Sequence, residues 1–255
     1  MKTYAIARNT FNESIRQPVI YLIAIIGTAL LLLSFAFTLF TFSEENTARM
    51  IKDMGLATIT LCALLVSLFT SSSVIADEIE KKTALTVLCK PVTRLQFLLG
   101  KYIGILLIVA CTIITLMLIF LAALWFLEHK IDVVLAEAGI FSFLQVAVLT
   151  AVSVAISTRF PLVVNVAICF LLYVAGHAST YIVEEAQKSG VVVRTCAYIL
   201  VTIFPNLENL NVSTLAAKGA AIPISCLAFG SLYSVLYVAA VLALALMALE
   251  RRELM

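Results

Sequence analysis

The fold is decided by the stretch MGLATITLCALLVSLFTSSSVIA at residues 54–76 and by DEIEKKTALTVLCKP at residues 77–91, which follows it directly. The first stretch contains no Asp, Glu, Lys or Arg and is long enough to cross the hydrocarbon core of a bilayer, which takes roughly 20 residues as a helix. The second stretch is densely charged. This order predicts a membrane-spanning helix that leads into a structured element outside the bilayer.

The composition of the whole chain supports a membrane protein. Of its 255 residues, 63% are hydrophobic and 13% are charged, against about 45–50% and about 25% in soluble domains. The surplus apolar surface must face lipid, because a soluble globule of this size needs more polar side chains to cover it. The net charge of +2 and the absence of a Lys/Arg block exclude a nucleic-acid binder.

Five further apolar stretches are long enough to span the membrane, and none has the alternating pattern of a barrel strand. The complete set of expected spans is 19–42, 54–76, 98–127, 138–158, 160–182 and 225–249, where the charge-free part of the third begins at Tyr102. We therefore expect an all-α membrane protein, a single transmembrane domain over residues 1–255 with six transmembrane helices.

The distribution of Lys and Arg predicts the orientation. If the N-terminus is cytoplasmic, eleven of the 17 Lys and Arg residues fall inside and six fall outside, which agrees with the positive-inside rule. We expect a multi-pass protein of the plasma (inner) membrane with both termini cytoplasmic.

Two shorter segments accompany the spans. Residues 1–17 place Tyr4, Ala7, Phe11 and Ile15 on one helical face, which predicts an amphipathic helix on the inner leaflet. Residues 191–205 are apolar over only half a bilayer and stop at a proline, so they predict an outer half-helix that is either re-entrant or interfacial.

The charged segment 77–91 has acids first and bases later, an order that suits a helix dipole, and it ends at Pro91. It predicts a short cytoplasmic helix. One interpretation is a solvated loop helix whose charges only fix the topology. The other is a docking surface for a soluble partner, which its length favours, because a simple turn could be much shorter.

The order DEIEKKTALTVLCKPVTRLQFLLGKYIG at 77–104 resembles the signature of permease subunits of type-2 ATP-binding-cassette (ABC) transporters. The resemblance extends to AIARNTFNESIRQ at 5–17, to FPNLENLNV at 204–212 and to ERREL at 250–254. In that family the segment between the second and third spans is the coupling helix, which sits in a cleft of the ATPase subunit. Cys89 departs from the pattern, since a small serine-like residue is common there.

The resemblance implies a dimer of permeases, homo- or heterodimeric, with two ABC ATPase subunits. It assigns ATPase coupling to these residues: Asp77, Glu78, Glu80, Lys81, Lys82, Thr83, Pro91 and Arg94. The chain has no G-x-x-x-x-G-K-[ST] phosphate loop. We therefore expect no enzyme activity and no cofactor in this chain, with ATP and Mg bound by the partner subunit.

A few small or polar residues inside the spans are candidates for packing or transport. Gly100 and Gly104 form a G-x-x-x-G step for close helix approach, either within the chain or at a dimer seam. The candidates for a translocation path are Ser67, Ser71, Asn165 and His177. Hydroxyls bonded to neighbouring helices and an interfacial histidine are the structural alternatives. The sequence offers no catalytic constellation and no metal-ligand cluster.

The favoured function is the membrane subunit of an ABC exporter. An ion-coupled secondary carrier is the first alternative, although such carriers usually keep a charged residue near mid-membrane, which the charge-free spans lack. A non-transporting membrane scaffold that recruits an ATPase is the second, because it needs the same docking helix.

Overall fold

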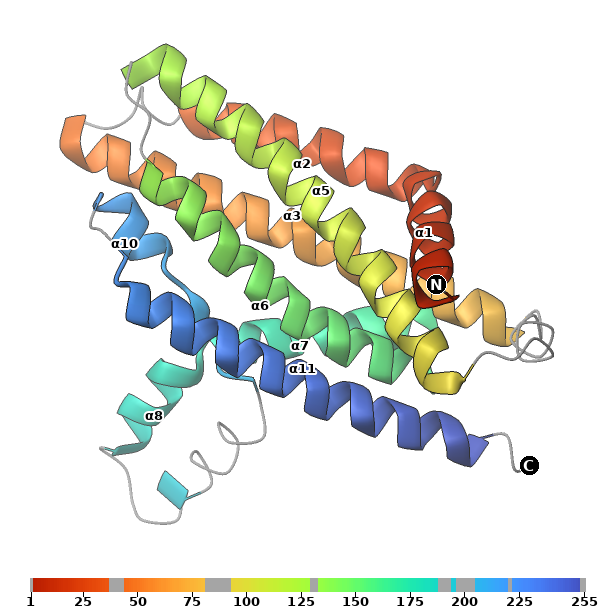
Figure 1. Cartoon of the computed structure of the whole chain (residues 1–255). Helices are drawn as coiled ribbons and strands as arrows, with labels where there is room; N and C mark the ends of the chain where they lie inside the picture. Colours follow the sequence, from red (N-terminus) through yellow and green to blue (C-terminus); the bar gives the residue numbers. More distant parts are fainter. Residues whose placement is uncertain are drawn as a thin grey trace.

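In the computed structural model, long helices run side by side and form one elongated bundle (Figure 1). The structure describes residues 2–36, 44–80, 93–128, 133–187, 194–195, 205–219 and 222–252. These residues form helices and connections and contain no strand. The bundle helices are α2 (Pro18–Ala36), α3 (Glu44–Glu80), α5 (Arg94–Glu128), α6 (Val133–Ser157), α7 (Leu162–His177) and α11 (Ile224–Arg252).

Five of the bundle helices are long and apolar enough to cross a membrane, and the pair α7 and α8 (Ser179–Gln187) makes a sixth if it is one bent span. The five lie at Pro18–Phe35, Ala48–Val74, Arg94–Phe126, Val134–Ser157 and Ser225–Ala248. The expectation of an all-α, multi-pass membrane protein is therefore confirmed. The starts of the five spans differ from the expected ones by up to six residues, and the largest of these differences is in the second span, which begins at Ala48 and not at Met54.

The fifth expected span, 160–182, is not one straight helix. α7 ends at His177, and the helix beyond it turns by 61°. Two contacts near the break explain it. The Ser179 hydroxyl donates to the carbonyl of Gly176 at 2.9 Å, and a Cβ at Gly176 would lie 2.7 Å from Leu207, so the segment after residue 204 packs directly against the helix backbone.

The centre of the bundle is the pair α3 and α6. Within their apolar windows 67% of the residues are buried, against 17% in α11. α6 contacts α3, α5, α7 and α11. The exposed apolar side chains of the outer helices, such as Phe229 and Leu232 on α11, are suited to face lipid, because acyl chains are as apolar as they are.

Helix α1 (Lys2–Ile15) lies across one end of the bundle, transverse to α2 (Figure 1). We call this the α1 end; the last turns of α3 and α11 and the first turns of α5 lie there too. The opposite end carries the short helix α10 (Ser213–Ala217), and we call it the α10 end.

The face by which α1 contacts the bundle overlaps only in part with the expected apolar face. Of the four expected residues, Ala7 is buried and Phe11 is partly buried against the core, whereas Tyr4 is 73% exposed and Ile15 is also exposed. Thr10 and Ser14 are buried as well. Small side chains at the contact allow α1 to lie directly against the helix beneath it, and Tyr4 and Ile15 are left where a bilayer would cover them.

Helix α5 begins at a capping box. Thr93 Oγ1 accepts from the backbone N–H of Gln96 at 3.3 Å, and Gln96 Oε1 accepts from the N–H of Thr93 at 3.4 Å. Thr93 follows the Pro91–Val92 pair, so the sequence that ends the charged segment also starts the next span.

Candidate functional site

A ladder of hydroxyl groups joins α3 to α6 inside the bundle. Thr60 donates to Ser142 Oγ at 2.9 Å, the hydroxyls of Ser67 and Thr150 lie 2.6 Å apart, and Ser71 bonds to Ser153. Residue numbers rise together on both sides, so the two helices run parallel. We call these three pairs the hydroxyl ladder; it ties the two central helices together at three levels.

Asn165 attaches α7 to the same ladder. Its side-chain amide donates to Ser72 Oγ at 2.6 Å and to Ser153 Oγ at 2.9 Å. Its carbonyl oxygen accepts from the thiol of Cys169 at 3.3 Å. Every polar atom of the Asn165 side chain is thus engaged, and the residue is fully buried.

Three of the four candidate translocation residues therefore meet in one packed cluster. Ser67, Ser71 and Asn165 are all fully buried and bond to groups on neighbouring helices. In this conformation they stabilise helix packing. The fourth candidate, His177, lies elsewhere.

His177 lies in a pocket at the α10 end of the bundle. The pocket has a volume of about 260 Å³, and its walls come from α3, α6, α7 and the segment 210–213. The polar groups in its wall include Asp53, Ser142, Gln145 and Asn211.

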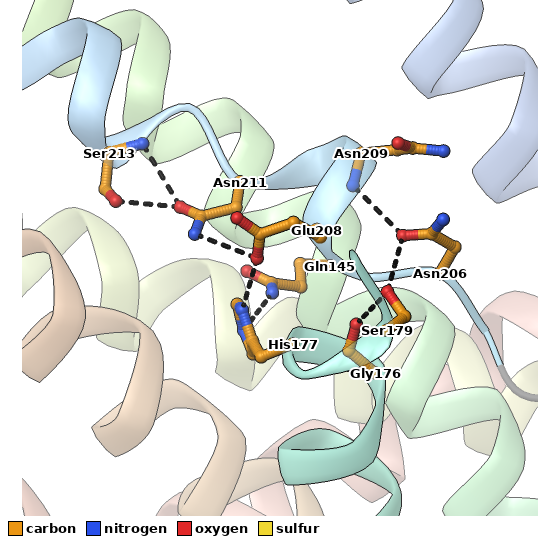
Figure 2. A network of polar contacts seen from close by, with 9 residues as sticks. All are labelled: Gln145, Gly176, His177, Ser179, Asn206, Glu208, Asn209, Asn211 and Ser213. Carbon is orange, nitrogen blue, oxygen red and sulfur yellow. Dashed lines mark hydrogen bonds and ion pairs between the residues drawn. The ribbon is translucent and has the colours of Figure 1, made fainter. Parts of the chain in front are cut away.

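The imidazole of His177 is held from both sides (Figure 2). Its Nε2 lies 2.6 Å from Gln145 Nε2, and its Nδ1 lies 3.2 Å from Glu208 Oε2. The amide N–H therefore donates to an unprotonated Nε2, and the Nδ1–H donates to the carboxylate. The edge of the ring also packs against Tyr173, at 4.6 Å between centroids.

Gln145 and Glu208 thus occupy the two ring nitrogens of His177 with one donor and one acceptor. Chemically the cluster is suited to a hydrogen-bonding ligand in the adjoining pocket.

The segment 205–213 is held over this pocket by its own asparagines (Figure 2). Asn211 donates to Glu208 Oε2 at 3.4 Å and accepts from Ser213 Oγ at 2.8 Å. Asn206 Oδ1 accepts from Ser179 at 3.2 Å. The asparagine-rich sequence PNLENLNVS at 205–213 therefore works as a polar clasp on the end of α7.

Sequence reasoning found His177 but missed its partners. Gln145 is an amide inside an otherwise apolar span, and this could have marked it. Glu208 gave no such signal, because it lies in a polar segment whose position relative to α7 depends on the fold. Within the described residues no group of three His, Cys, Asp or Glu side chains could hold a metal ion.

The G-x-x-x-G pair, Gly100 and Gly104, lies at the α1 end of the bundle. A Cβ at Gly100 would lie 2.8 Å from Ile6, and one at Gly104 would lie 2.6 Å from Thr10. The two glycines thus form the surface on which α1 rests, so this G-x-x-x-G step is used within the chain. The Lys101 ammonium, on the same turn, lies 4.0 Å from Glu13 Oε2.

The structure describes only some of the residues that were assigned to ATPase coupling. Asp77, Glu78 and Glu80 belong to the last turn of α3, which continues to Glu80 without a break. Arg94 is the first residue of α5. Lys81, Lys82, Thr83 and Pro91 lie outside the described residues, as does most of segments 77–91 and 191–205.

A family model described as "ABC-2 family transporter protein" matches residues 4–254. No curated protein matches the chain.

Proposed function

Because this chain belongs to the ABC-2 transporter family and is a membrane subunit of an ABC transporter, we propose that a separate ATPase subunit docks on residues 77–91 and drives export. The membership bears out the resemblance of the sequence and implies an ABC ATPase as partner. In this proposal the ATPase binds ATP and Mg, and this chain receives the motion.

The observation that carries the proposal is the continuity of α3. This helix has 37 residues, so it is roughly 55 Å long, against about 30 Å for the hydrocarbon core. Its apolar window ends at Val74, and the acidic turn with Asp77, Glu78 and Glu80 follows in the same helix. A force applied to that turn would therefore act on the centre of the bundle without an intervening hinge.

The hydroxyl ladder would transmit the movement of α3 to neighbouring helices. Since α3 is bonded to α6 at three levels and to α7 through Asn165, a displacement of α3 carries those helices with it. We expect the outer helices α2 and α11 to follow less closely, because few of their residues are buried. The rearrangement would thus open the bundle between its centre and its periphery.

The proposed orientation has both termini in the cytoplasm. It is supported by the positive-inside distribution of Lys and Arg and by the position of α1 and the end of α11 at the same end as the acidic turn of α3 (Figure 1). Two copies of this chain, or one copy and a related permease, would enclose the path.

The experiment is coexpression with a candidate ABC ATPase, followed by purification and mass measurement of the intact complex. The expected assembly contains two permease and two ATPase subunits. In inside-out vesicles, ATP added to the outside should then drive substrate uptake into the lumen. A chain that purifies alone even after cross-linking would refute the coupling, and substrate loss from the lumen would refute the direction.

A further inference from the structure

A cavity of about 460 Å³ lies where α1 crosses α5, on the outside of the bundle. Its wall is mostly formed by side chains of two kinds. Ile103, Leu107 and Phe11 are apolar, and Tyr4, Arg8 and Asn12 are polar or amphipathic. The proposed function makes no use of any of them.

The apolar floor comes from α5. Ile103 and Leu107 are one helical turn apart and are 43% and 47% exposed, so they point away from the bundle core. Because both residues lie within the apolar span Arg94–Phe126, an acyl chain of the bilayer would cover them.

The polar rim comes from α1. Arg8 and Asn12 are exposed and also one turn apart. Among the described residues no carboxylate pairs with Arg8, and the acid of α1, Glu13, is directed at Lys101. A guanidinium presents a planar fork of donors that matches a phosphate. The exposed phenol of Tyr4 suits the headgroup region of a bilayer.

The cavity is also preformed. α1 is seated on Gly100 and Gly104, so the rim and the floor are held at a fixed separation. A ligand that binds there does not need to order the helix, which lowers the cost of binding.

We propose that this cavity binds one anionic phospholipid, with an acyl chain along Ile103 and Leu107 and its phosphate at Arg8. The inference deepens the proposed function, since it rests on the cytoplasmic placement of α1, where the leaflet is rich in anionic lipid. The bound lipid would add contacts between α1 and the span that follows the ATPase docking segment.

The test is native mass spectrometry of the purified chain in detergent, with added phosphatidylglycerol or phosphatidylcholine of the same acyl composition. The wild-type chain should retain one phosphatidylglycerol in preference to phosphatidylcholine. Arg8→Gln should weaken that preference about five-fold, the effect of one basic residue near an anionic surface. Arg16 is an exposed cation one residue beyond the end of α1 and outside the cavity, so Arg16→Gln should leave the preference unchanged.

A second pair of variants tests the apolar floor. Leu107→Trp fills the cavity and should lower retention of either lipid. Leu171→Trp, on a lipid-facing position of α7 that is 67% exposed, should not.

Three results would overturn the proposal: equal retention of the two lipids, an equal loss in the Arg16→Gln variant, or displacement of the lipid by soluble glycerol 3-phosphate. The last would show a site for free phosphate. Because the measurement needs neither an ATPase nor a sealed membrane, its outcome is independent of whether coupling and orientation are as proposed.

Discussion

Replacement of Asn165 by leucine is the most informative change in the bundle. Asn165→Leu keeps the volume of the side chain but removes two interhelical hydrogen bonds, to Ser72 and Ser153, and the weaker bond that it accepts from the Cys169 thiol within α7. Both hydroxyls keep another partner, since Ser72 bonds to the carbonyl of Leu68 and Ser153 to Ser71. Interhelical hydrogen bonds in membranes contribute about 0.6 kcal/mol on average and at most about 1.7 kcal/mol each. We therefore expect a loss of about 1–3 kcal/mol in the free energy of unfolding.

The assay is equilibrium unfolding by SDS in mixed micelles. The matched control is Thr58→Val, because the Thr58 hydroxyl is exposed and bonds only within its own helix, to Met54 at 2.8 Å; it should change the free energy by less than about 0.5 kcal/mol. An Asn165→Leu protein that unfolds like the wild type but no longer transports would refute the reasoning, because it would place Asn165 on a hydrated path.

Two further predictions concern the ends of the bundle. Gly104→Val should destabilise the protein by about 1–3 kcal/mol through overpacking, because its Cβ would meet Thr10 at 2.6 Å; an unchanged SDS unfolding curve would contradict the seating of α1. Glu208→Ala removes the acceptor shared by His177 and Asn211, so amide hydrogen exchange in 205–213 should be about ten-fold faster, the effect of about 1.4 kcal/mol. Asn209→Ala, with an exposed side chain, is its control, and equal exchange in both variants would argue against the clasp.

Much of the fold follows from local sequence, because span length is set by the bilayer and apolar stretches of that length are easy to find. The break after His177 could not be predicted in this way. It depends on Leu207 packing against Gly176, a contact between residues on either side of a long connection. The contact between His177 and Glu208 depends on the same segment. The partners of His177 could therefore be identified only from the folded structure.

The seating of α1 shows a second limit. Hydrophobic periodicity placed Tyr4, Ala7, Phe11 and Ile15 on one face of α1, and of these Tyr4 and Ile15 are exposed while Ala7 is buried. Thr10 and Ser14, which that periodicity does not select, are buried too, and Thr10 fits against Gly104 on another helix. A helix contact made by small residues needs small residues on both helices. The contact face of α1 could therefore not be identified from the sequence of α1 alone.

The hydroxyl groups show what the structure adds to a pattern that has two interpretations. From the sequence, Ser67 and Ser71 could line a path or bond to neighbours. Their partners Thr150 and Ser153 lie on α6, so in this conformation they hold two helices together. In the proposed mechanism, α3 and α6 would therefore move together.

The central claim is that an ATPase docks on the end of α3, and the most direct test is the affinity of a purified candidate ATPase for this chain in nanodiscs. The Glu78→Lys/Glu80→Lys double variant should bind at least about thirty-fold more weakly, since like charges at an interface cost about 2 kcal/mol or more. Glu137→Lys, an exposed acid near the opposite end of the bundle, is the control and should bind as the wild type does. Equal affinity of all three proteins for the ATPase would contradict the account.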